Sequence, residues 1–405
     1  MDTLEAKYAK LATDNAPGQE VRQSASGLSD LLRGETLLGT PVDFSHGDVD
    51  AFLPTPGAFE AFSAGVAPGS GQAYTEYRGS GAIREMLAER LAAFTGAPIS
   101  ADQGLIITPG TQGALFLAVA ATAGAGDKVA IVQPDYFANR KLVEFFGAIL
   151  VPVTLNYHQT SDQAGLDLSQ LEDAFRSGAK VFLFSNPNNP VGVIYSEAEI
   201  AEIAGLAGRY GATVIVDQLY SRLLYEGRSY AHLRAGRVDP ENVLTIMGPS
   251  KTESLSGYRL GVAFGSTRLI DRMEKLQAIV SLRAPGYSQA VLKTWFAEPE
   301  GWLAERIRLH QAIRDDLLAV LGPVPRLEVR SPEAGSYIFP KLPELAVPTQ
   351  DFVRILRRQA GVTVTPGAEF GPHSLGSIRL NFSQDHRAAV AAIGRAADLI
   401  ERYRR

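Results

Sequence analysis

Seven short apolar runs that alternate with stretches of helical character constrain the fold of this chain more than any other feature. They occupy the region from Leu105 to about residue 270 and read GLIIT, KVAIV, AILVPV, KVFLF, ATVIV, NVLTIM and LGVAFG. Apolar strands separated by helices are typical of a mostly parallel sheet that is covered on both faces. The sequence therefore predicts an α/β fold with a large, doubly wound domain around a seven-stranded sheet.

The segments that flank this region predict a smaller α/β unit. Helical character extends from about Arg268 to Leu321 with a break near Pro285, and mixed strands (336–340, 377–382) and helices (351–359, 387–403) follow. The first 40 residues are helix-prone and weakly apolar, which indicates an arm or a short leading helix. We expect three parts: an N-terminal arm that belongs to the small domain (1–45), a large domain (46–290) and a small C-terminal domain (291–405).

Composition excludes several classes of protein. The 405 residues include no cysteine, which excludes disulfides, thiolate metal sites and cysteine nucleophiles. The net charge of -5 provides no basic field for nucleic acid or anionic lipid. No run of about 18 apolar residues is present, and the N-terminal residues lack the basic start and apolar stretch of a signal peptide. We therefore expect a cytoplasmic protein without a membrane span.

Two turns that follow apolar runs carry groups suited to ligand binding. Parallel sheets bind ligands where their strands end, so these positions are informative. The segment TPGTQGAL after GLIIT contains Gly110, Thr111 and Gln112, and a Gly-rich turn before a helix can present backbone N–H groups to a phosphate. After KVFLF, the turn NPNNPVG leaves the side-chain donor of Asn189 at the sheet edge. An ordinary connecting turn is the alternative in both places.

Two charged residues follow two further runs. Asp217 ends ATVIV, and an acid at the end of a buried strand needs a cationic partner or several hydrogen bonds. A protonated pyridine nitrogen is such a partner, and a helix N-cap is the alternative. Lys251 follows NVLTIM in SKTESLSGYRLG, where the cation of Arg259 favours a neutral, nucleophilic amine; a solvated surface charge is the alternative. Arg259 can also grip a phosphate in a bidentate fork. Together the four features match the contacts that pyridoxal 5′-phosphate (PLP) needs.

These motifs resemble those of a known enzyme family. NPNNPVG is close to NPxNPTG, SKTESLSGYRLG is close to SKxxxxxGxRxG, and DxxY lies between them. From about residue 40 to the C-terminus, the chain resembles the fold-type I PLP-dependent aminotransferases of the class I and II group, which contains aspartate, aromatic and alanine aminotransferases. The resemblance implies amino-group transfer between an L-amino acid and a 2-oxo acid. It also implies a small domain made from both chain ends and a homodimer whose active sites share residues.

The resemblance assigns catalytic and ring-binding roles. Lys251 resembles the lysine that forms an imine with the cofactor, and Asp217 resembles the acid on the pyridine nitrogen. Asn189 and Tyr220 resemble the donors to the phenolic oxygen. Tyr136, in QPDYF, lies where the family stacks an aromatic ring on the cofactor, although a core-filling role is the alternative.

The resemblance also implies phosphate and substrate contacts. The phosphate set is Gly110, Thr111, Gln112, Ser250 and Arg259. Tyr74, in AYTEYRGSG, resembles the tyrosine that reaches the partner's phosphate, with packing inside its own subunit as the alternative. Arg379, in SIRLNFS, resembles the arginine that binds the substrate α-carboxylate, with a surface charge as the alternative, and Gly47 in SHGDVD and Asn189 lie near that carboxylate.

The chain departs from the family pattern at several positions. Gly248 replaces the common Ser or Thr three residues before the lysine, which removes one hydroxyl from the phosphate cup. Gln218 replaces Glu after the strand aspartate, and Val191 replaces Thr in NPTG. The segment SHGDVD, with Asp48 and Asp50, is more acidic than usual.

Arg283 is a candidate reader of an acidic side chain. It lies in SLRAPGYS, which is broadly similar to an Arg-Pro…Tyr-Ser segment whose arginine reaches the neighbouring subunit's substrate in aspartate-specific relatives. Here the arginine is four residues before Tyr287 rather than three. The alternative is a solvated charge or an interface ion pair.

Two other functions remain open at this point. The same cofactor-holding set serves PLP-dependent lyases, cyclising enzymes and oxidases, and the sequence separates them poorly from transaminases. A ligand-sensing regulator can also use this fold as a binding module. Such regulators carry a DNA-binding domain ahead of it, and no basic recognition helix is visible in the 40 residues that precede the resemblance.

Overall fold

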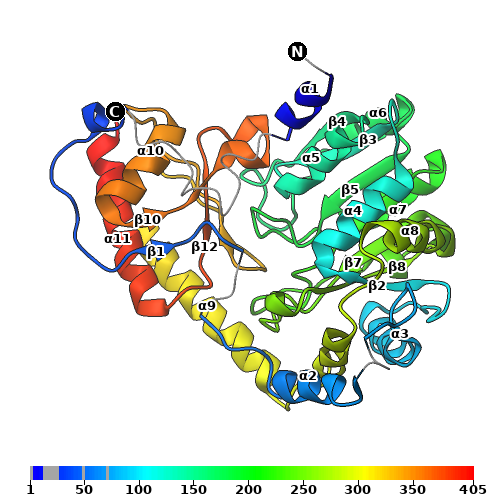
Figure 1. The fold of residues 1–405 in the computed structure, drawn as a ribbon. Coiled ribbons are helices and arrows are strands. Elements are labelled where there is room, and N and C mark those ends of the chain that lie inside the picture. The colour runs from blue at the N-terminus through cyan, green and yellow to red at the C-terminus, as the bar shows by residue number, and fades with distance from the viewer. Residues whose placement is uncertain (1–2, 12–26, 48–50, 70–72) are drawn as a thin grey trace.

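One large sheet forms the core of the larger half of the molecule (Figure 1). The computed structural model describes residues 3–11, 27–47, 51–69 and 73–405. Among them, seven strands pair in the order β2-β8-β7-β6-β5-β3-β4, and only β8 runs antiparallel to its neighbours. The strands are β2 (Leu105–Pro109), β3 (Lys128–Gln133), β4 (Ile149–Thr154), β5 (Val181–Ser185), β6 (Thr213–Asp217), β7 (Val243–Met247) and β8 (Leu260–Gly265). The predicted mostly parallel, seven-stranded sheet is confirmed.

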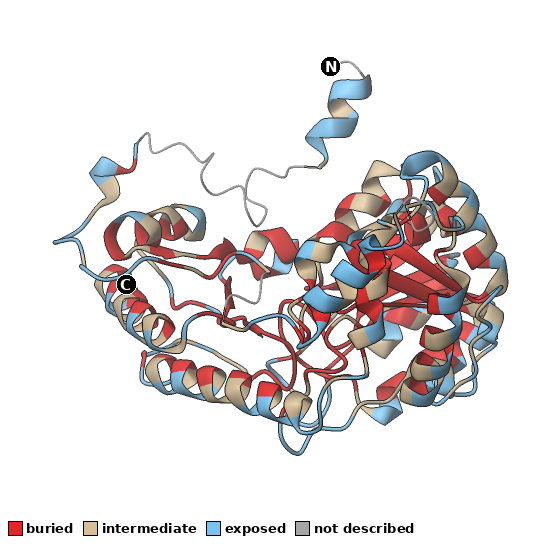
Figure 2. Cartoon of the chain, turned by 60° about the horizontal axis from the view of Figure 1, so that its bottom comes forward, coloured by how far each residue is buried: buried red, intermediate tan, exposed pale blue. Residues whose placement is uncertain are grey.

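Helices cover both faces of this sheet, and alternate strand residues point to opposite layers. In β3, Ile131 packs with helices α4, α5 and α8, whereas Ala130 and Val132 pack with α6 and α7. Figure 2 shows the strands as buried. The helices of this half are α2 (Ala58–Val66), α3 (Gly81–Thr95), α4 (Gly110–Thr122), α5 (Phe137–Phe145), α6 (Leu168–Arg176), α7 (Glu197–Tyr210) and α8 (Thr267–Val280). The short helix α1 (Thr3–Ala9) lies against α5 through Tyr8 and Phe145.

A second apolar core joins segments from both ends of the chain. Strand β1 (Val42–Asp43) pairs with β10 (Val362–Thr363), and Leu28 and Phe44 pack with residues between 313 and 403. The other elements are the strands β9 (Tyr337–Ile338), β11 (Thr365–Pro366) and β12 (Ile378–Asn381) and the helices α9 (Trp302–Leu321), α10 (Thr349–Ile355) and α11 (His386–Tyr403). Figure 1 shows this smaller half beside the large sheet, with the long helix α9 running along its lower side toward α2.

The segment between the two cores packs on the large half. Val291, Leu292 and Trp295, in and just after the 3-10 helix η8 (Tyr287–Thr294), share an apolar cluster with Leu105 of β2 and Phe264 of β8. Apolar packing around the sheet thus continues past residue 290, and the expected domain boundaries at 45 and 290 stay predictions. Within the described residues, no helix has both the length and the apolar character that a membrane span requires.

One buried carboxylate holds the start of α7 against the loop of residues 164–166. Ser196 and Glu199 form a capping box. The Glu199 carboxylate also accepts hydrogen bonds from the backbone N–H groups of Ala164, Gly165 and Leu166, at 2.8–3.1 Å. A single side chain therefore satisfies several buried donors, which would otherwise each cost about 1–3 kcal/mol.

We predict that Glu199→Ala lowers the apparent Tm by roughly 5 °C or more, because it leaves these buried N–H groups without an acceptor. Glu197→Ala is the matched control, since Glu197 is exposed on the same helical turn. Thermal unfolding followed by circular dichroism measures both variants. An equal, small change in the two proteins would contradict the role of Glu199.

Candidate active site

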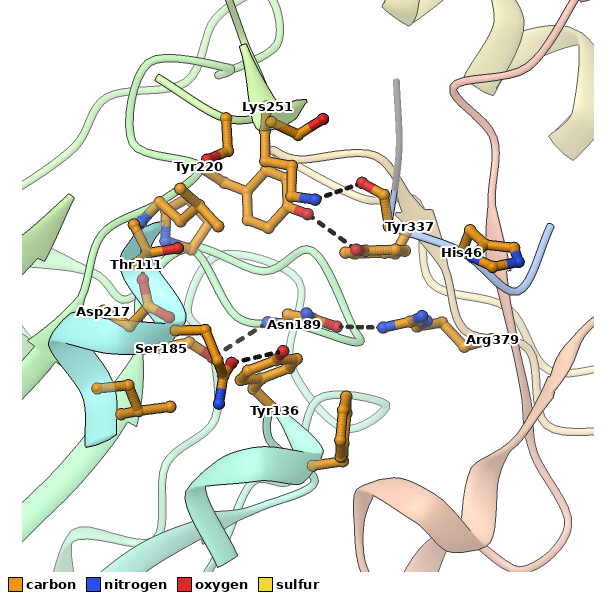
Figure 3. Close-up of a pocket in the computed structure, with 18 of the residues that line it drawn as sticks. His46, Thr111, Tyr136, Ser185, Asn189, Asp217, Tyr220, Lys251, Tyr337 and Arg379 are labelled. Atoms are coloured by element: carbon orange, nitrogen blue, oxygen red, sulfur yellow. Dashed lines mark hydrogen bonds between the residues drawn. The ribbon is translucent and has the colours of Figure 1, made fainter. Parts of the chain in front are cut away.

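A cavity of about 270 Å³ lies at the carboxyl edge of the sheet, between the two halves of the molecule. It gathers residues from β6, from the loops after β3, β5 and β7, and from β9 and β12 (Figure 3). The predicted site residues that line it are Gly47, Thr111, Gln112, Tyr136, Asn189, Asp217, Tyr220, Ser250, Lys251, Arg259 and Arg379. The structure thus brings together residues that are more than 300 positions apart in the sequence.

Asp217 is the buried acid of this cavity. It is the last residue of β6, and its carboxylate accepts a hydrogen bond from the Leu219 N–H at 3.1 Å. Burial raises the pKa of Asp217 to about 6, whereas the Leu219 amide and the charge of Lys251 lower it. The carboxylate therefore lacks a strong cationic partner of its own chain, and a bound cation against it would stabilise its charged form.

Lys251 follows β7 and reaches across the cavity. Its amine donates a hydrogen bond to the backbone oxygen of Gly47, which belongs to the small half (Figure 3). A Cβ on Gly47 would lie 3.0 Å from both the Lys251 Nζ and the Tyr337 hydroxyl. Any side chain here would crowd the ends of both of these side chains.

A buried ion-pair cluster holds the loop of Lys251. Arg222 lies two residues after Tyr220 and donates hydrogen bonds to Glu253 and to both carboxylate oxygens of Glu298, the latter at 2.7 and 3.0 Å. Burial raises the pKa of Glu253 to about 7, and the Arg222 guanidinium opposes this shift. The cluster links the Tyr220 loop to the Lys251 loop.

Arg379 is almost completely buried on the opposite wall. Its guanidinium donates to the Asn189 side-chain oxygen at 3.2 Å and to the Ser45 backbone oxygen at 2.7 Å. The rings of Tyr337 and Phe370 lie 4.2 and 4.8 Å from its central carbon. The arginine is thus a fixed cation whose remaining donors can bind a carboxylate.

The corner formed by β2 and α4 is shaped by close packing. Gly110 has a φ of 76° and opens α4, and a Cβ there would collide with the Arg259 guanidinium. A Cβ on Gly248 would lie 2.7 Å from the Thr111 methyl carbon. The Gln112 side-chain oxygen accepts a hydrogen bond from the Tyr136 hydroxyl at 3.0 Å.

Three predicted residues, Gly110, Tyr74 and Arg283, are not among those that line the cavity of their own chain. Tyr74 is 73% exposed, and Arg283 lies over its ring at 4.6 Å and over the ring of Tyr77 at 5.1 Å. The acidic segment that contains Asp48 and Asp50 lies outside the described residues.

Sequence reasoning missed a second buried acid near Asp217. Asp135 accepts hydrogen bonds from the Ser185 N–H at 2.9 Å and from the Ser185 hydroxyl, and that hydroxyl oxygen accepts the Asn189 N–H at 3.2 Å. Burial raises the pKa of Asp135 to about 8, against hydrogen bonds that favour its charged form. Asp135 follows an apolar strand at the same sheet edge as Asp217, so the same sequence signal could have identified it.

Tyr337 was also missed. It lines the cavity from β9, and its hydroxyl lies 2.9 Å from that of Tyr220. No sequence signal distinguishes its cavity-facing side chain from its neighbours in a strand of two residues. Among the described residues, no group of three or more His, Cys, Asp or Glu side chains could hold a metal ion.

Comparison with known proteins agrees with this arrangement. The family model for aminotransferase class I and II matches residues 41–393. The chain is similar to the crystal structure of an aspartate aminotransferase from Rhodobacter sphaeroides, with 67% identity, a TM-score of 0.96 and full coverage of both chains. It is 27% identical to the aspartate aminotransferase of Sulfolobus acidocaldarius over 82% of this chain and 84% of that protein. It is likewise 27% identical to the aspartate/prephenate aminotransferase of Thermus thermophilus over 96% and 95% of the two chains.

These matches also decide between the reactions that the motifs left open, because they favour amino-group transfer over lyase, cyclase or oxidase chemistry. A family model that covers most of the chain and a relative of 67% identity leave the regulator without support. The chain belongs to the class I and II aminotransferases, enzymes that transfer an amino group between an amino acid and a 2-oxo acid.

Proposed function

We propose that this transaminase binds PLP covalently on Lys251 and uses it to transfer the amino group of an acidic amino acid. The observation that carries the proposal is the opposed placement of Lys251 and Asp217 in one cavity. An amine and a buried acid are the two groups that hold the two ends of the PLP ring. The raised pKa of Asp217, caused by burial, fits a site that is completed by the protonated pyridine nitrogen.

The residues around the cavity fit the other parts of PLP. Asn189 and Tyr220 provide donors for the phenolic oxygen, and Tyr136 provides a ring that can stack on the pyridine. The corner of Gly110, Thr111 and Arg259 combines a helix N-terminus, a hydroxyl and a guanidinium, which suits a phosphate. The Thr111 methyl group fills the space in front of Gly248, and we assign to the Thr111 hydroxyl the phosphate contact that the family commonly supplies from position 248.

When bound, PLP supplies an electron-accepting ring that makes the Cα–H bond of an attached amino acid acidic. Asp217 keeps the proton on the pyridine nitrogen. Arg379 binds the substrate α-carboxylate and thereby orients Cα toward the Lys251 side of the cavity. The Lys251 amine, once free, is the base that takes the proton from Cα.

We predict that borohydride reduction of the purified yellow protein fixes PLP to a peptide that contains Lys251, as mass spectrometry would detect. Lys251→Ala should lower turnover by orders of magnitude, because the base and the covalent anchor are lost together. Lys293→Ala is the control, since Lys293 is an exposed lysine outside the cavity. Full turnover in Lys251→Ala would refute the assignment.

Thr111 and Gly248 allow a swap experiment. Thr111→Gly should raise the Kd for PLP about tenfold, the effect of losing one hydrogen bond to a charged group. Gly248→Ser alone should also weaken binding, because its side chain meets the Thr111 methyl group. The double variant should recover most of the affinity, since the hydroxyl returns from the other wall. Titration of the apoprotein with PLP measures all four proteins, and additive losses in the double variant would contradict the exchange.

We also propose that the enzyme is a homodimer in which Tyr74 and Arg283 serve the partner's site. Several large apolar side chains near this site are 41–82% exposed, which suits burial against a second copy of the chain. They are Tyr74, Tyr77, Ile279, Val280 and Leu282. The Arg283 guanidinium lies over both tyrosine rings, and its N–H groups are suited to bind a carboxylate. Its buried Nε has no hydrogen-bond partner among the described residues.

Arg283 therefore supports aspartate or glutamate as the amino donor, as does the similarity to the Rhodobacter sphaeroides aspartate aminotransferase. We predict that Arg283→Ala lowers kcat/KM for aspartate and glutamate by about 100-fold, because a bidentate charge-assisted contact is lost. The value for leucine should be unchanged or higher. The exposed residue Arg387 gives a control variant, Arg387→Ala. Equal effects on acidic and apolar substrates, or none, would exclude this role.

A further inference from the structure

The hydroxyl groups of Tyr220 and Tyr337 form a buried pair at the edge of the cavity. They lie 2.9 Å apart, and the two residues are only 4% and 3% exposed (Figure 3). Tyr220 comes from the loop after β6 in the large half, whereas Tyr337 comes from β9 in the small half. The pair is therefore a direct polar contact between the two halves at the reacting end of the cavity.

The number of protons on the two hydroxyl groups determines which of them donates to the other when a ligand is bound. Each phenol has one proton to donate and can also accept a hydrogen bond. If Tyr220 donates its proton to a ligand oxygen, it can no longer donate to Tyr337. Tyr337 must then donate to Tyr220 for the pair to keep its hydrogen bond, and chained donors of this kind strengthen one another.

The cation of Arg379 favours this direction. The Arg379 guanidinium lies 4.2 Å from the centre of the Tyr337 ring, and a cation on a phenol ring makes its hydroxyl a better donor. Burial raises the pKa of Tyr220, as do the charge and the hydrogen bond of Tyr337, whereas Arg379 and Ser336 lower it. The Lys251 amine approaches the same side of Gly47 as the Tyr337 hydroxyl, and Asp217 is an acid that lines the cavity. No carboxylate accepts a hydrogen bond from Tyr337 among the contacts of the described residues.

We propose that Tyr337 is a positioning residue that acts through Tyr220: it donates its hydroxyl proton to Tyr220 and so strengthens the hydrogen bond from Tyr220 to the phenolic oxygen of PLP. This inference rests on the proposed binding of PLP at Lys251. It adds a second tyrosine, from the small half of the chain, to the group that controls the charge of that oxygen.

The test is a spectrophotometric pH titration of the bound cofactor. The phenolic oxygen and the Lys251 nitrogen share one proton, and donors to the oxygen weaken its hold on that proton. Tyr337→Phe removes a donor but keeps the ring beneath Arg379, so the pKa of the absorbance transition should rise by about half a unit. Tyr220→Phe should raise it further. In the Tyr220→Phe background, Tyr337→Phe should have no additional effect.

Tyr195→Phe is the matched control, because the buried Tyr195 hydroxyl is outside the cavity and has no hydrogen-bond partner among the described residues. It should leave the transition unchanged. An unchanged pKa in Tyr337→Phe, or an equal shift with and without Tyr220, would overturn the inference while leaving PLP binding intact. If the wild-type protein showed no visible PLP band, the proposed function itself would fail, which is a separate and recognisable result.

Discussion

The common carboxyl edge of the parallel strands is the constraint on which the site depends. Strands β3, β5, β6 and β7 run in the same direction, so the residues that follow them meet at one edge of the sheet. That edge delivers Tyr136, Asn189, Asp217 and Lys251 to a single cavity. The strands themselves are buried on both faces, which lets them hold polar groups in fixed positions at their ends.

The second wall of the cavity has a different origin. It comes from short strands and loops of the small half, where β12 pairs with β9 and places Arg379 and Tyr337 side by side. Backbone contacts connect this wall to the N-terminal part of the chain, because the Ser45 oxygen accepts from Arg379 and the Gly47 oxygen accepts from Lys251. A substrate carboxylate bound to Arg379 would therefore lie next to contacts that join the two halves of the molecule.

Sequence patterns predict the large half well because its signals are local. Each of the seven apolar runs is a strand in the structure, and the polar residues that follow four of them line the cavity as expected. The position of Tyr337 could not be predicted with the same ease, because its role depends on Tyr220, which only the tertiary arrangement brings near. Asp135 follows an apolar strand, as Asp217 does, and only its partner Ser185 required the tertiary structure.

An exchange of side-chain volume between two positions is equally difficult to predict from a single sequence. In the sequence, Gly248 indicates the loss of a hydroxyl, yet the structure shows the Thr111 side chain in the adjacent space. Such compensation requires knowledge of which side chains face each other across the end of a sheet. The roles of the individual cavity residues, and that of Arg283 outside the cavity of its own chain, stay predictions.

The cluster of Arg222, Glu253 and Glu298 has a kinetic consequence for the lysine beside it. Glu253 is only two residues from Lys251, and its buried ion pair fixes the backbone from which the lysine side chain extends. In the proposed mechanism, this ion pair keeps the loop in place when the lysine is released from PLP, so only its four-carbon side chain gains freedom. The amine thus stays at a high effective molarity around the reacting carbon, which favours repeated turnover over escape of the base.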